Sequence, residues 1–291
     1  MRTLKKLSDP GFWQYVLGGA WRRLGNPPAC PCCGSGLGVV VDRKFLHSLI
    51  ECADCGILHR YPTEQDREMA EFYQQAYDEP GFASEMPDEA TLQQLLATNF
   101  KGSAKDFSGQ VAILEALGLR RGQRLMDFGA SWGYATHQFC QAGFAAEGFE
   151  LSKPRAAFGR RLGLDIAGQP PEGGPPFDMV YSCHVLEHVP NPLQTLRKML
   201  AWVKPGGMVV AQTPNGSREF RAANPAAFHR LWGRVHPFLL TADFVTRNFA
   251  HQPCYVSSDD RPARVQAWDR ASRHVADLGG SNLFFALVKT T

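Results

Sequence analysis

The second half of the chain alternates between short apolar runs and amphipathic stretches. Apolar runs that are typical of strands end at Asp127 and occupy residues 144–150, 162–166, 177–182 and 208–212. Stretches that are typical of helices separate most of these runs, at residues 134–142, 152–161 and 191–203. Strands that alternate with helices predict a parallel sheet whose ligands lie at the carboxyl ends of the strands.

The first half of the chain has a different pattern. Short runs typical of a hairpin occur at residues 39–41 and 45–50. Stretches typical of helices then follow at residues 63–77, 88–100 and 108–117. These helices precede the first strand of the sheet, so they either cover the site as a lid or pack against the sheet edge.

The length of the chain limits the number of domains that it is able to form. With 291 residues there is room for one α/β domain and a smaller module. We expect four parts, which are an N-terminal segment (1–28), a cysteine-containing module (29–62), connecting helices (63–108) and the α/β domain (109–291).

Composition and charge argue against several classes of function. Lys and Arg total 31 against 28 Asp and Glu, so the net charge of +3 gives no strong attraction for nucleic acid. No run approaches the roughly 18 apolar residues that would predict a membrane span. Residues 11–21 are short, interrupted by glycines and lack a small-residue cleavage site, so they do not predict a signal peptide.

Five of the 8 cysteines lie between Cys30 and Cys55, which favours metal binding in a reducing cytoplasm over a disulfide framework. Cys30 with Cys33 and Cys52 with Cys55 form two C-x2-C pairs, and a glycine follows each pair. Four thiolates complete a tetrahedral site with no open position, so the predicted Zn²⁺ is structural. Cys32 does not keep this spacing and is left out.

The module around these cysteines resembles a zinc ribbon. The positive charges of its basic residues are balanced by the negative charges of Asp42, Glu51 and Asp54. A surface with so little net charge is not expected to bind phosphate groups. We interpret the module as a scaffold. The alternative is direct contact between its surface and a substrate.

A glycine-containing turn follows the first strand of the α/β domain. Asp127 is followed by Gly129 and Gly133, and a helix is expected directly after them. Glycines let the backbone approach a ligand closely, and the helix N-terminus adds partial positive charge. Glu150 ends the second strand 23 positions after Asp127, where a carboxylate is able to accept hydrogen bonds from both hydroxyls of a ribose.

These motifs resemble, in their order, those of class I S-adenosylmethionine-dependent methyltransferases. The matching segments are residues 127–133, 148–152, 177–178, 185–188 and 204–207. The resemblance implies an α/β, Rossmann-like domain with a seven-stranded, mostly parallel sheet and one antiparallel strand near its edge. A zinc ribbon ahead of such a domain is similar to a subgroup that includes methyltransferases acting on nucleotide-linked deoxysugars.

The resemblance also implies which residues bind the methyl donor, S-adenosylmethionine. The predicted set is Asp127, Gly129, Ala130, Gly133, Glu150, Leu151 and His184. Ser131 replaces the middle glycine of the usual three, and no residue is assigned to the adenine amino group. A dinucleotide is the alternative ligand, but the G-x-G-x-x-G pattern that it needs is missing from this turn.

The acceptor is expected beyond the fourth and fifth strands. Methyl transfer from a sulfonium is an in-line displacement that needs positioning and, for some acceptors, a base. Histidine titrates near neutral pH and suits that role. The catalytic candidates are His236, then His229 and His188, and each has the alternative of a hydrogen-bonded histidine that only holds its loop.

Four arginines share the connection that follows the fifth strand. If they face the cleft, they suit an acceptor that carries a phosphate or a carboxylate, and otherwise they form a solvated rim. These residues are Arg218, Arg221, Arg230 and Arg234.

The function that these features favour is methyl transfer to a small-molecule acceptor, namely a sugar nucleotide or a related glycosyl group. One alternative is an RNA methyltransferase that binds its RNA substrate through the zinc ribbon. Another is a non-catalytic protein that kept the fold. The sequence leaves open the acceptor, the methylated atom and the oligomeric state, a homo-oligomer included.

Overall fold

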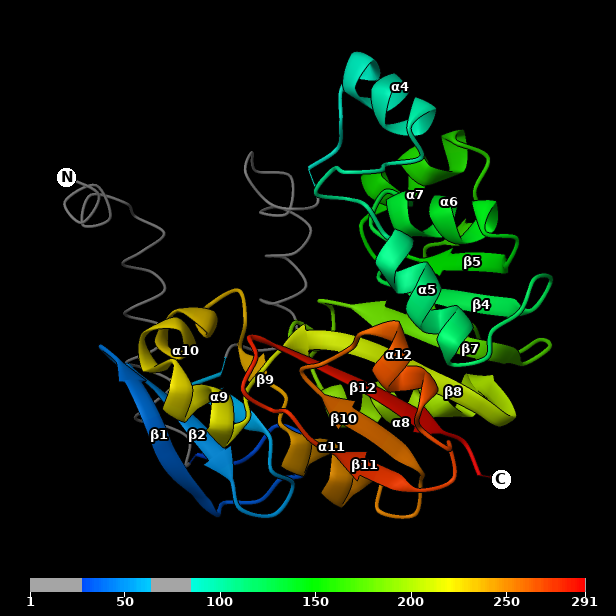
Figure 1. The fold of residues 1–291 in the computed structure, drawn as a ribbon. Coiled ribbons are helices and arrows are strands. Elements are labelled where there is room, and N and C mark those ends of the chain that lie inside the picture. Colours follow the sequence, from blue (N-terminus) through cyan, green and yellow to red (C-terminus); the bar gives the residue numbers. More distant parts are fainter. Residues whose placement is uncertain (1–27, 64–84, 291) are drawn as a thin grey trace, which may run out of the picture.

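A computed structural model of the protein describes residues 28–63 and 85–290 (Figure 1). The N-terminal segment and the helix expected at residues 63–77 lie almost entirely outside these ranges. The helix expected at residues 88–100 is present as α4 (Glu89–Ala97). Its first turn is capped by the Asp88 carboxylate, which accepts a hydrogen bond from Thr91 N at 2.8 Å.

The α/β domain is built on one sheet of eight strands (Figure 1). From one edge to the other they are β11 (Arg273–Val275), β10 (Cys254–Ser257), β12 (Asn282–Val288), β8 (Val203–Pro214), β7 (Phe177–Cys183), β4 (Arg124–Phe128), β5 (Ala145–Phe149) and β6 (Ile166–Ala167). Every neighbouring pair is parallel, except that β12 runs antiparallel to both β8 and β10. The expected mostly parallel sheet with one antiparallel strand near its edge is confirmed.

The edge strand β11 extends the seven-stranded sheet that the resemblance implied. It pairs in parallel with β10, and all three of its residues are exposed. An edge strand that buries neither face shows no alternation of apolar and polar residues, so the sequence pattern contains no sign of it.

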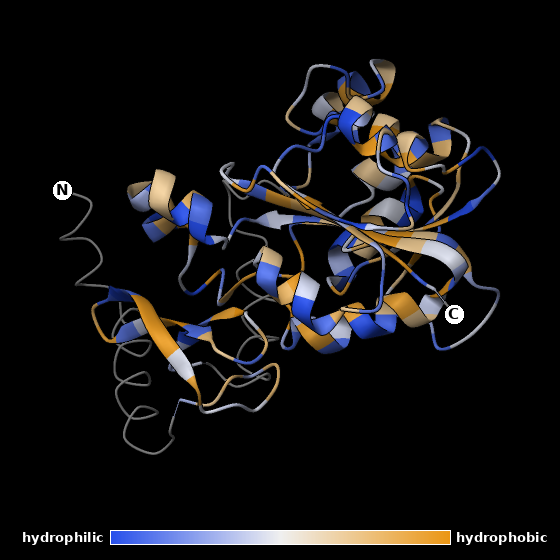
Figure 2. Cartoon of the chain, turned by 60° about the horizontal axis from the view of Figure 1, so that its bottom comes forward, coloured by the Kyte–Doolittle hydropathy of each residue, from blue (hydrophilic) through white to orange (hydrophobic). Residues whose placement is uncertain are grey.

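Alternate residues of the central strands enter two hydrophobic clusters, one on each face of the sheet. Leu125 and Val210 pack with α5 (Ser108–Ala116) and α6 (Tyr134–Gln141). Their neighbours Met126 and Val209 pack with α8 (Pro192–Trp202) and α11 (Ala242–Asn248). Figure 2 shows hydrophobic residues concentrated in the central strands and mixed with polar ones on the helices. This is the alternation expected of strands buried on both faces.

Two further helices belong to the domain. The helix α7 (Lys153–Arg161) contacts the edge strand β6, and α12 (Pro262–Gln266) contacts α5. The chain returns to the sheet in β12, near its C-terminal end.

The Lys-Pro-Gly-Gly segment (residues 204–207), one of the segments that carry the resemblance, is a bulge inside β8. The register of β7 and β8 shifts between the Phe177–Val203 pair and the Met179–Met208 pair, so four residues of β8 lie opposite Asp178 alone. The extra residues bend the start of β8 away from its neighbour.

A second sheet contains the cysteine module. Its strands, all antiparallel, are β1 (Gly38–Lys44), β2 (His47–Cys52), β3 (Leu58–Tyr61) and β9 (Phe238–Leu239). The expected hairpin corresponds to β1 and β2. The fourth strand comes from the other part of the chain, because Leu58 pairs with Leu239 and His59 with Phe238. The cysteine module and the connection after β8 therefore share one sheet.

The connection after β8 carries α9 (Arg218–Ala223) and α10 (Pro225–Leu231) before it reaches β9. Its aromatic residues Phe220, Phe228 and Trp232 form a small core with Leu49 and Leu58 of the cysteine module. Burying a large apolar side chain contributes roughly 1.5–3 kcal/mol, so this core holds the connection on the module.

Candidate functional site

Three residues in left-handed backbone conformations shape the glycine turn (residues 129–133), which links β4 to α6. Gly129 has φ 88°, Ser131 φ 51° and Gly133 φ 92°. Glycine adopts such angles freely, whereas they are uncommon for a residue with a side chain. The Ser131 N–H donates a hydrogen bond to Glu150 Oε2 at 2.9 Å, which stabilises the unusual angle.

The glycines of this turn have no space for a side chain. A Cβ on Gly129 would lie 2.2 Å from Val185 Cγ2, and a Cβ on Gly133 would lie 2.4 Å from Leu164 Cδ1. Val185 belongs to the segment that follows β7. The glycine turn and that segment are therefore in direct contact and form one continuous site.

Glu150 directly follows β5 and is nearly buried, with 8% of its surface exposed. One carboxylate oxygen accepts from Ser131 N, and the other accepts from Ser152 N at 2.7 Å. Burial raises the pKa of Glu150, while these amide hydrogen bonds oppose the rise. Each oxygen has a further lone pair, so Glu150 is able to accept two more hydrogen bonds from a ligand above the turn.

Asp127 lies beneath the glycine turn. It is 3% exposed, and its Oδ2 accepts a hydrogen bond from Thr136 Oγ1 of α6 at 2.7 Å. Burial raises the pKa of Asp127 to about 7; the Thr136 hydrogen bond opposes this rise and the nearby Glu150 carboxylate adds to it. The Asp127 carboxyl group thus connects β4 to α6 and supports the turn from below.

Ala130 and Leu151 differ in exposure. Ala130 is buried against β5, where a Cβ on Gly148 would come within 2.8 Å of the Ala130 Cβ. Leu151 follows Glu150 and is 49% exposed, which is unusual for so large an apolar side chain. Leu151 therefore offers apolar surface beside the Glu150 carboxylate, whereas Ala130 contributes close packing.

Two buried polar atoms next to the turn, Ser131 Oγ and Trp132 Nε1, have no hydrogen-bond partner within the described part of the chain. Buried polar atoms are normally satisfied, so an unsatisfied hydroxyl beside a backbone turn is what a ligand site would show. Together with the remaining lone pairs of Glu150, it fits a ligand that carries ribose hydroxyls.

Four residues that we call the histidine cluster (His184, Glu187, His188 and His236) meet beyond the carboxyl ends of β7 and β8. The fully buried Glu187 has its Oε1 3.3 Å from His184 Nδ1 and 3.8 Å from His188 Nε2. Its Oε2 accepts a hydrogen bond from Thr213 Oγ1 at 3.0 Å. The ring centroids of His188 and His236 are 4.8 Å apart. The structure therefore brings three of the predicted histidines to one carboxylate.

Backbone carbonyl groups fix the rings of the two inner histidines. His188 Nδ1 is 2.7 Å from Val235 O, and His236 Nδ1 is 2.6 Å from Leu231 O. Because a carbonyl oxygen only accepts, each Nδ1 carries the proton, and in the neutral ring Nε2 then has the lone pair. Burial lowers the pKa of His188, which favours its neutral form. Burial by itself would raise the pKa of Glu187, but the neighbouring histidines outweigh it and lower that pKa overall.

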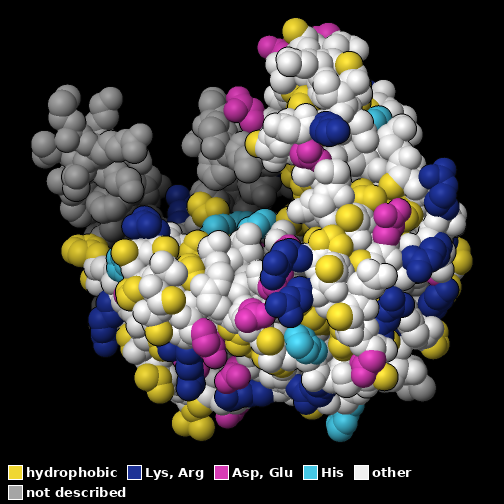
Figure 3. All heavy atoms as spheres, viewed as in Figure 1, with side chains coloured by type: hydrophobic (Ala, Val, Ile, Leu, Met, Phe, Trp, Pro, Cys, Tyr) yellow, Lys and Arg dark blue, Asp and Glu magenta, His cyan; other side chains and the backbone are white. Residues whose placement is uncertain are grey.

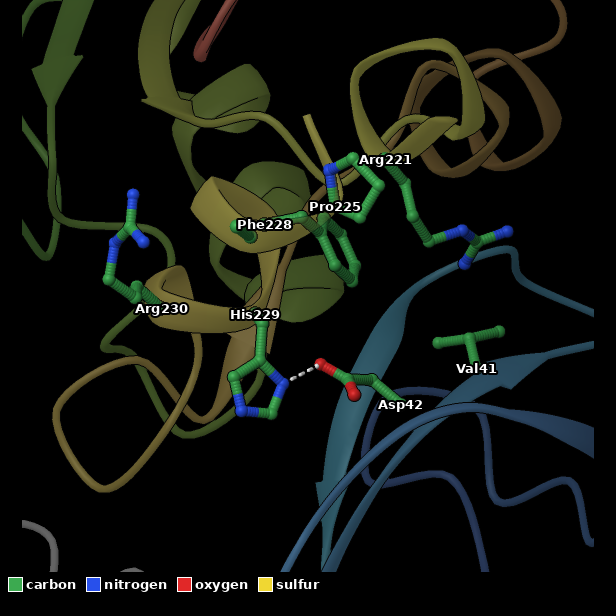
Figure 4. A pocket seen from close by; sticks show the side chains of 8 residues that line it. Val41, Asp42, Arg221, Pro225, Phe228, His229 and Arg230 are labelled. Atoms are coloured by element: carbon green, nitrogen blue, oxygen red, sulfur yellow. Dashed lines mark hydrogen bonds and ion pairs between the residues drawn. The ribbon is translucent and has the colours of Figure 1, made fainter. Parts of the chain in front are cut away.

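His229 does not join the histidine cluster. Its Nδ1 lies 2.8 Å from Asp42 Oδ2 of β1 (Figure 4). Trp232 Nε1 donates to the same oxygen at 2.7 Å. His229 lines a surface pocket of about 500 Å³ between β1 and α10. It belongs to the contact between the cysteine module and the connection after β8.

Two of the four arginines also contact the cysteine module. Arg218 Nη2 lies 2.6 Å from Glu51 Oε1, and Arg221 Nη2 lies 3.4 Å from Glu51 Oε2. Figure 4 shows the guanidinium of Arg230 directed away from Asp42 at the edge of the same surface pocket. Arg218 and Arg221 thus share the Glu51 carboxylate, and Arg221 and Arg230 line the surface pocket, while a phosphate or carboxylate subsite stays a prediction.

The four cysteines of the two C-x2-C pairs come together. Their Sγ atoms all lie within 4.8 Å of one another, with Cys30 and Cys55 3.6 Å apart and Cys33 and Cys52 3.5 Å apart. Thiolates arranged tetrahedrally at Zn–S distances of about 2.3 Å are about 3.8 Å apart, so the donor set fits Zn²⁺. Cys32 lies outside this set.

Both cysteine pairs pack on the α/β domain. Asn191, the N-cap of α8, donates a hydrogen bond from Nδ2 to Pro31 O at 3.0 Å. Asn248 of α11 donates from Nδ2 to Cys55 O at 2.8 Å. Three of the cysteines share a hydrophobic cluster with α8 and α11. The cysteine module is therefore an integral part of the structure around the histidine cluster.

The sequence pattern does not show that Glu187 is the centre of the histidine cluster. One signal was present, because His184 and Glu187 are three positions apart and such residues are neighbours on a helical turn. No sequence pattern predicts the hydrogen bond from Thr213 to Glu187. This bond depends on the register between β7 and β8 and on the bulge in β8.

The order of the strands and the glycine turn at the ends of β4 and β5 are those of a class I S-adenosylmethionine-dependent methyltransferase, and the chain contains a methyltransferase domain of this class. More specifically, the chain belongs to the methyltransferase-domain family, whose profile matches residues 85–260. This match extends from just before α4 to just after β10.

Similar curated proteins are named ubiquinone biosynthesis O-methyltransferases. The one from Caulobacter vibrioides is 33% identical over 105 residues, which are 32% of this chain and 42% of that protein. The one from Stutzerimonas stutzeri is 26% identical over 174 residues, which are 55% of this chain and 68% of that protein. The chain thus spans less than half of the length of the Caulobacter protein.

Similar solved structures show the same fold. The plantazolicin methyltransferase BpumL, in complex with SAH, has a TM-score of 0.51 at 10% identity, and the match covers 78% of this chain and 95% of that one. The magnesium protoporphyrin IX methyltransferase of Synechocystis PCC 6803, with bound SAM, has a TM-score of 0.50 at 12% identity and coverages of 78% and 99%. Among the helices of the described residues, none has the length and apolar character of a membrane span.

Proposed function

We propose that this enzyme transfers a methyl group from S-adenosylmethionine to a hydroxyl group of a small-molecule acceptor, namely a sugar nucleotide or a related glycosyl group. The contact between Gly129 and Val185 carries this proposal, because it places the histidine cluster directly beside the glycine turn. The names of the curated relatives support oxygen as the methylated atom. The resemblance to zinc-ribbon methyltransferases of deoxysugars supports a glycosyl acceptor.

The glycine turn and Glu150 form the proposed donor site. When bound there, S-adenosylmethionine supplies an electrophilic methyl group. Glu150 accepts hydrogen bonds from the ribose hydroxyls, and the exposed Leu151 covers the adjoining apolar part of the ligand. Asp127 and Ala130 hold the turn in shape, and His184 lies on the side of the site that faces the acceptor.

His236 is the proposed base. Its Nδ1–H donates to Leu231 O, which leaves the Nε2 lone pair to take the proton of the acceptor hydroxyl. A positioned base contributes about 10²–10⁴ in rate. His188 lies beside it, and the Glu187 carboxylate orients His188 and His184.

The proposed role of the cysteine site is to hold a structural Zn²⁺. RNA binding by the module is the weaker alternative, because two of its basic residues, His59 and Arg60, are buried and so are not available to contact RNA. Glu51 is already engaged with Arg218 and Arg221, so the module presents a mixed surface to solvent.

The proposal is tested with labelled donor and a panel of acceptors. We expect label on a sugar nucleotide and not on RNA, and a kcat that falls by about 10²–10⁴ in His236→Ala. The control His229→Ala alters a histidine of the same connection that faces Asp42, and its kcat should stay near that of the wild type. Label on RNA alone would refute the proposed acceptor, and absence of donor binding by calorimetry would refute the donor site.

A further inference from the structure

We infer that Glu187, His188 and His236 form a second metal site, which binds a divalent first-row transition-metal ion next to the donor site. One ligand atom from each residue lies within 4.8 Å of the other two. Ligands on opposite sides of an ion with bonds of about 2.1 Å are about 4.2 Å apart. Small side-chain rotations therefore bring all three atoms to bonding distance.

The two imidazoles are held as metal-binding histidines usually are. A ligating histidine donates its other ring N–H to a carbonyl or carboxylate, which fixes the tautomer and aims the second nitrogen at the ion. His188 donates from Nδ1 to Val235 O, and His236 donates from Nδ1 to Leu231 O. Both carbonyl groups belong to the connection after β8, so this short segment orients both rings.

The third ligand is a carboxylate that is shielded from solvent. Glu187 is fully buried, and Thr213 accounts for only one of its oxygens. The other oxygen, Oε1, lies 3.3 Å from Nδ1 of the half-exposed His184 and 3.8 Å from His188 Nε2, and within the described residues it accepts no well-formed hydrogen bond. Buried charges are normally paired or coordinate a metal, and a cation between these atoms would satisfy Oε1 directly.

The chemistry of the ligands selects the class of ion. Two imidazole nitrogens and one carboxylate oxygen suit Zn²⁺, Fe²⁺, Co²⁺ or Mn²⁺, and three protein ligands leave coordination positions open. This set contains no thiolate, which separates it chemically from the four-cysteine site. His184, which contacts the same carboxylate, has 45% of its side chain exposed, so the cluster is reached from solvent on that side. Figure 3 shows histidine side chains at the surface between the α10 side and the α4–α7 side of the molecule.

The role of the ion rests on the proposed function. Glu187, His188 and His236 would hold the ion, which would lower the pKa of an acceptor hydroxyl bound to it, so that the hydroxyl would release its proton to water. The oxygen of that hydroxyl forms the new O–CH₃ bond as the S–CH₃ bond of the donor breaks. The His236 Nε2 lone pair cannot bind an ion and take a proton together, so the proposed base role of His236 would apply to the enzyme without this ion, and in the metal-bound enzyme the ion would activate the hydroxyl instead.

The test uses the full chain with its cysteine site filled by Zn²⁺, and Co²⁺ as the probe. Calorimetry should show one Co²⁺ bound per chain, and the absorption should be that of nitrogen and oxygen ligands without a thiolate charge-transfer band. His236→Ala and Glu187→Gln should each weaken Co²⁺ binding at least tenfold. His229→Ala is the matched control and should bind Co²⁺ as the wild type does, because His229 faces Asp42.

Two readouts keep the metal site and the proposed function distinct. Binding of S-adenosylmethionine is measured on the same samples and should be unchanged in His236→Ala, which also shows that this variant is folded. Equal Co²⁺ affinity of wild type and His236→Ala, or no Co²⁺ bound beyond the cysteine site, overturns the second metal site. Normal Co²⁺ binding without any donor binding supports the metal site and refutes the proposed function instead.

Discussion

The side chain of Asn248 donates a hydrogen bond to the carbonyl oxygen of Cys55, 2.8 Å away, and so attaches a cysteine pair to α11. Asn191 does the same for the other pair, through Pro31 O at the start of α8. The helices that cover one face of the sheet are thereby tied to the geometry of the cysteine site. A change in that site should reach the histidine cluster through the connection after β8.

Loss of the cysteine site should destabilise the whole protein. Cys33→Ser removes one of the four thiolates, and we expect it to lower the Tm by more than about 5 °C, because each kcal/mol corresponds to roughly 2–4 °C in a domain of this size. The KM for the acceptor should rise more than the Kd for S-adenosylmethionine. Cys140→Ser, at an exposed cysteine outside the cluster, is the control. Equal Tm values for both variants would contradict the scaffold role.

Gly129→Ala should destabilise the enzyme by about 2–4 kcal/mol. Alanine would be strained at the left-handed backbone angle of this position, and its Cβ would overlap the side chain of Val185. The double variant Gly129→Ala/Val185→Ala should recover part of this loss, because it removes the overlap and leaves only the backbone strain. Gly173→Ala, where a Cβ has open space, is the control. Denaturant unfolding of the four proteins measures the effect. No recovery in the double variant would show that Val185 is not the obstacle.

Glu150→Gln should weaken binding of S-adenosylmethionine by about 10–100-fold, since a hydrogen bond to a charged group contributes roughly 1.5–3 kcal/mol. The substitution keeps the shape of the side chain but removes the charge that accepts from Ser131 N and Ser152 N. Glu147→Gln, on the same strand, pairs with Arg124 and should bind the donor normally. Calorimetry gives both affinities, and an unchanged Kd for Glu150→Gln would remove Glu150 from the donor site.

The titration of Asp127 should lower the stability of the protein as the pH rises toward neutrality, against the opposite contribution of carboxyls such as Glu187, whose pKa is lowered. The pKa of Asp127 is raised from 3.8 to about 7, so the folded protein binds this proton more tightly than the unfolded chain does. The contribution of Asp127 to the free energy of unfolding therefore decreases between about pH 4 and about pH 7, by at most about 1.4 kcal/mol per pH unit. Above the folded pKa this contribution is fully lost.

Asp127→Asn isolates that effect, because it removes the titrating group but keeps an oxygen that accepts from Thr136. The stability of Asp127→Asn relative to the wild type should increase from about pH 4 to about pH 7 and then stay constant. Denaturant unfolding at several pH values measures both proteins. Parallel curves over this range would show that Asp127 titrates outside it.

The main sheet was predictable because each central strand is buried on both faces and appears in the sequence as an apolar run. The residues of the glycine turn, Glu150 and the cysteine pairs were predictable for another reason. Their chemistry depends on short spacings along the chain, which fold into fixed local geometry. The strand β9 was not predictable, because two residues carry no periodicity and their partner β3 lies far away in sequence.

The connection after β8 shows why the acceptor side was harder to predict. His229 and His236 are close in sequence, but they face different parts of the molecule. The difference arises because Phe228 packs on the cysteine module and turns α10 toward β1. A sequence shows that histidines and arginines share a segment, whereas only tertiary packing decides which of them face one another.

The pairing of β3 with β9 also constrains the order of events during biosynthesis. A ribosome releases the cysteine module early, yet Leu239, the partner of Leu58, emerges only after most of the α/β domain. Until then the edge of β3 lacks its native neighbour, and exposed strand edges promote aggregation. Early loading of Zn²⁺ on the nascent chain would hold the module in shape during this interval, so metal supply would affect the yield of folded enzyme as well as its stability.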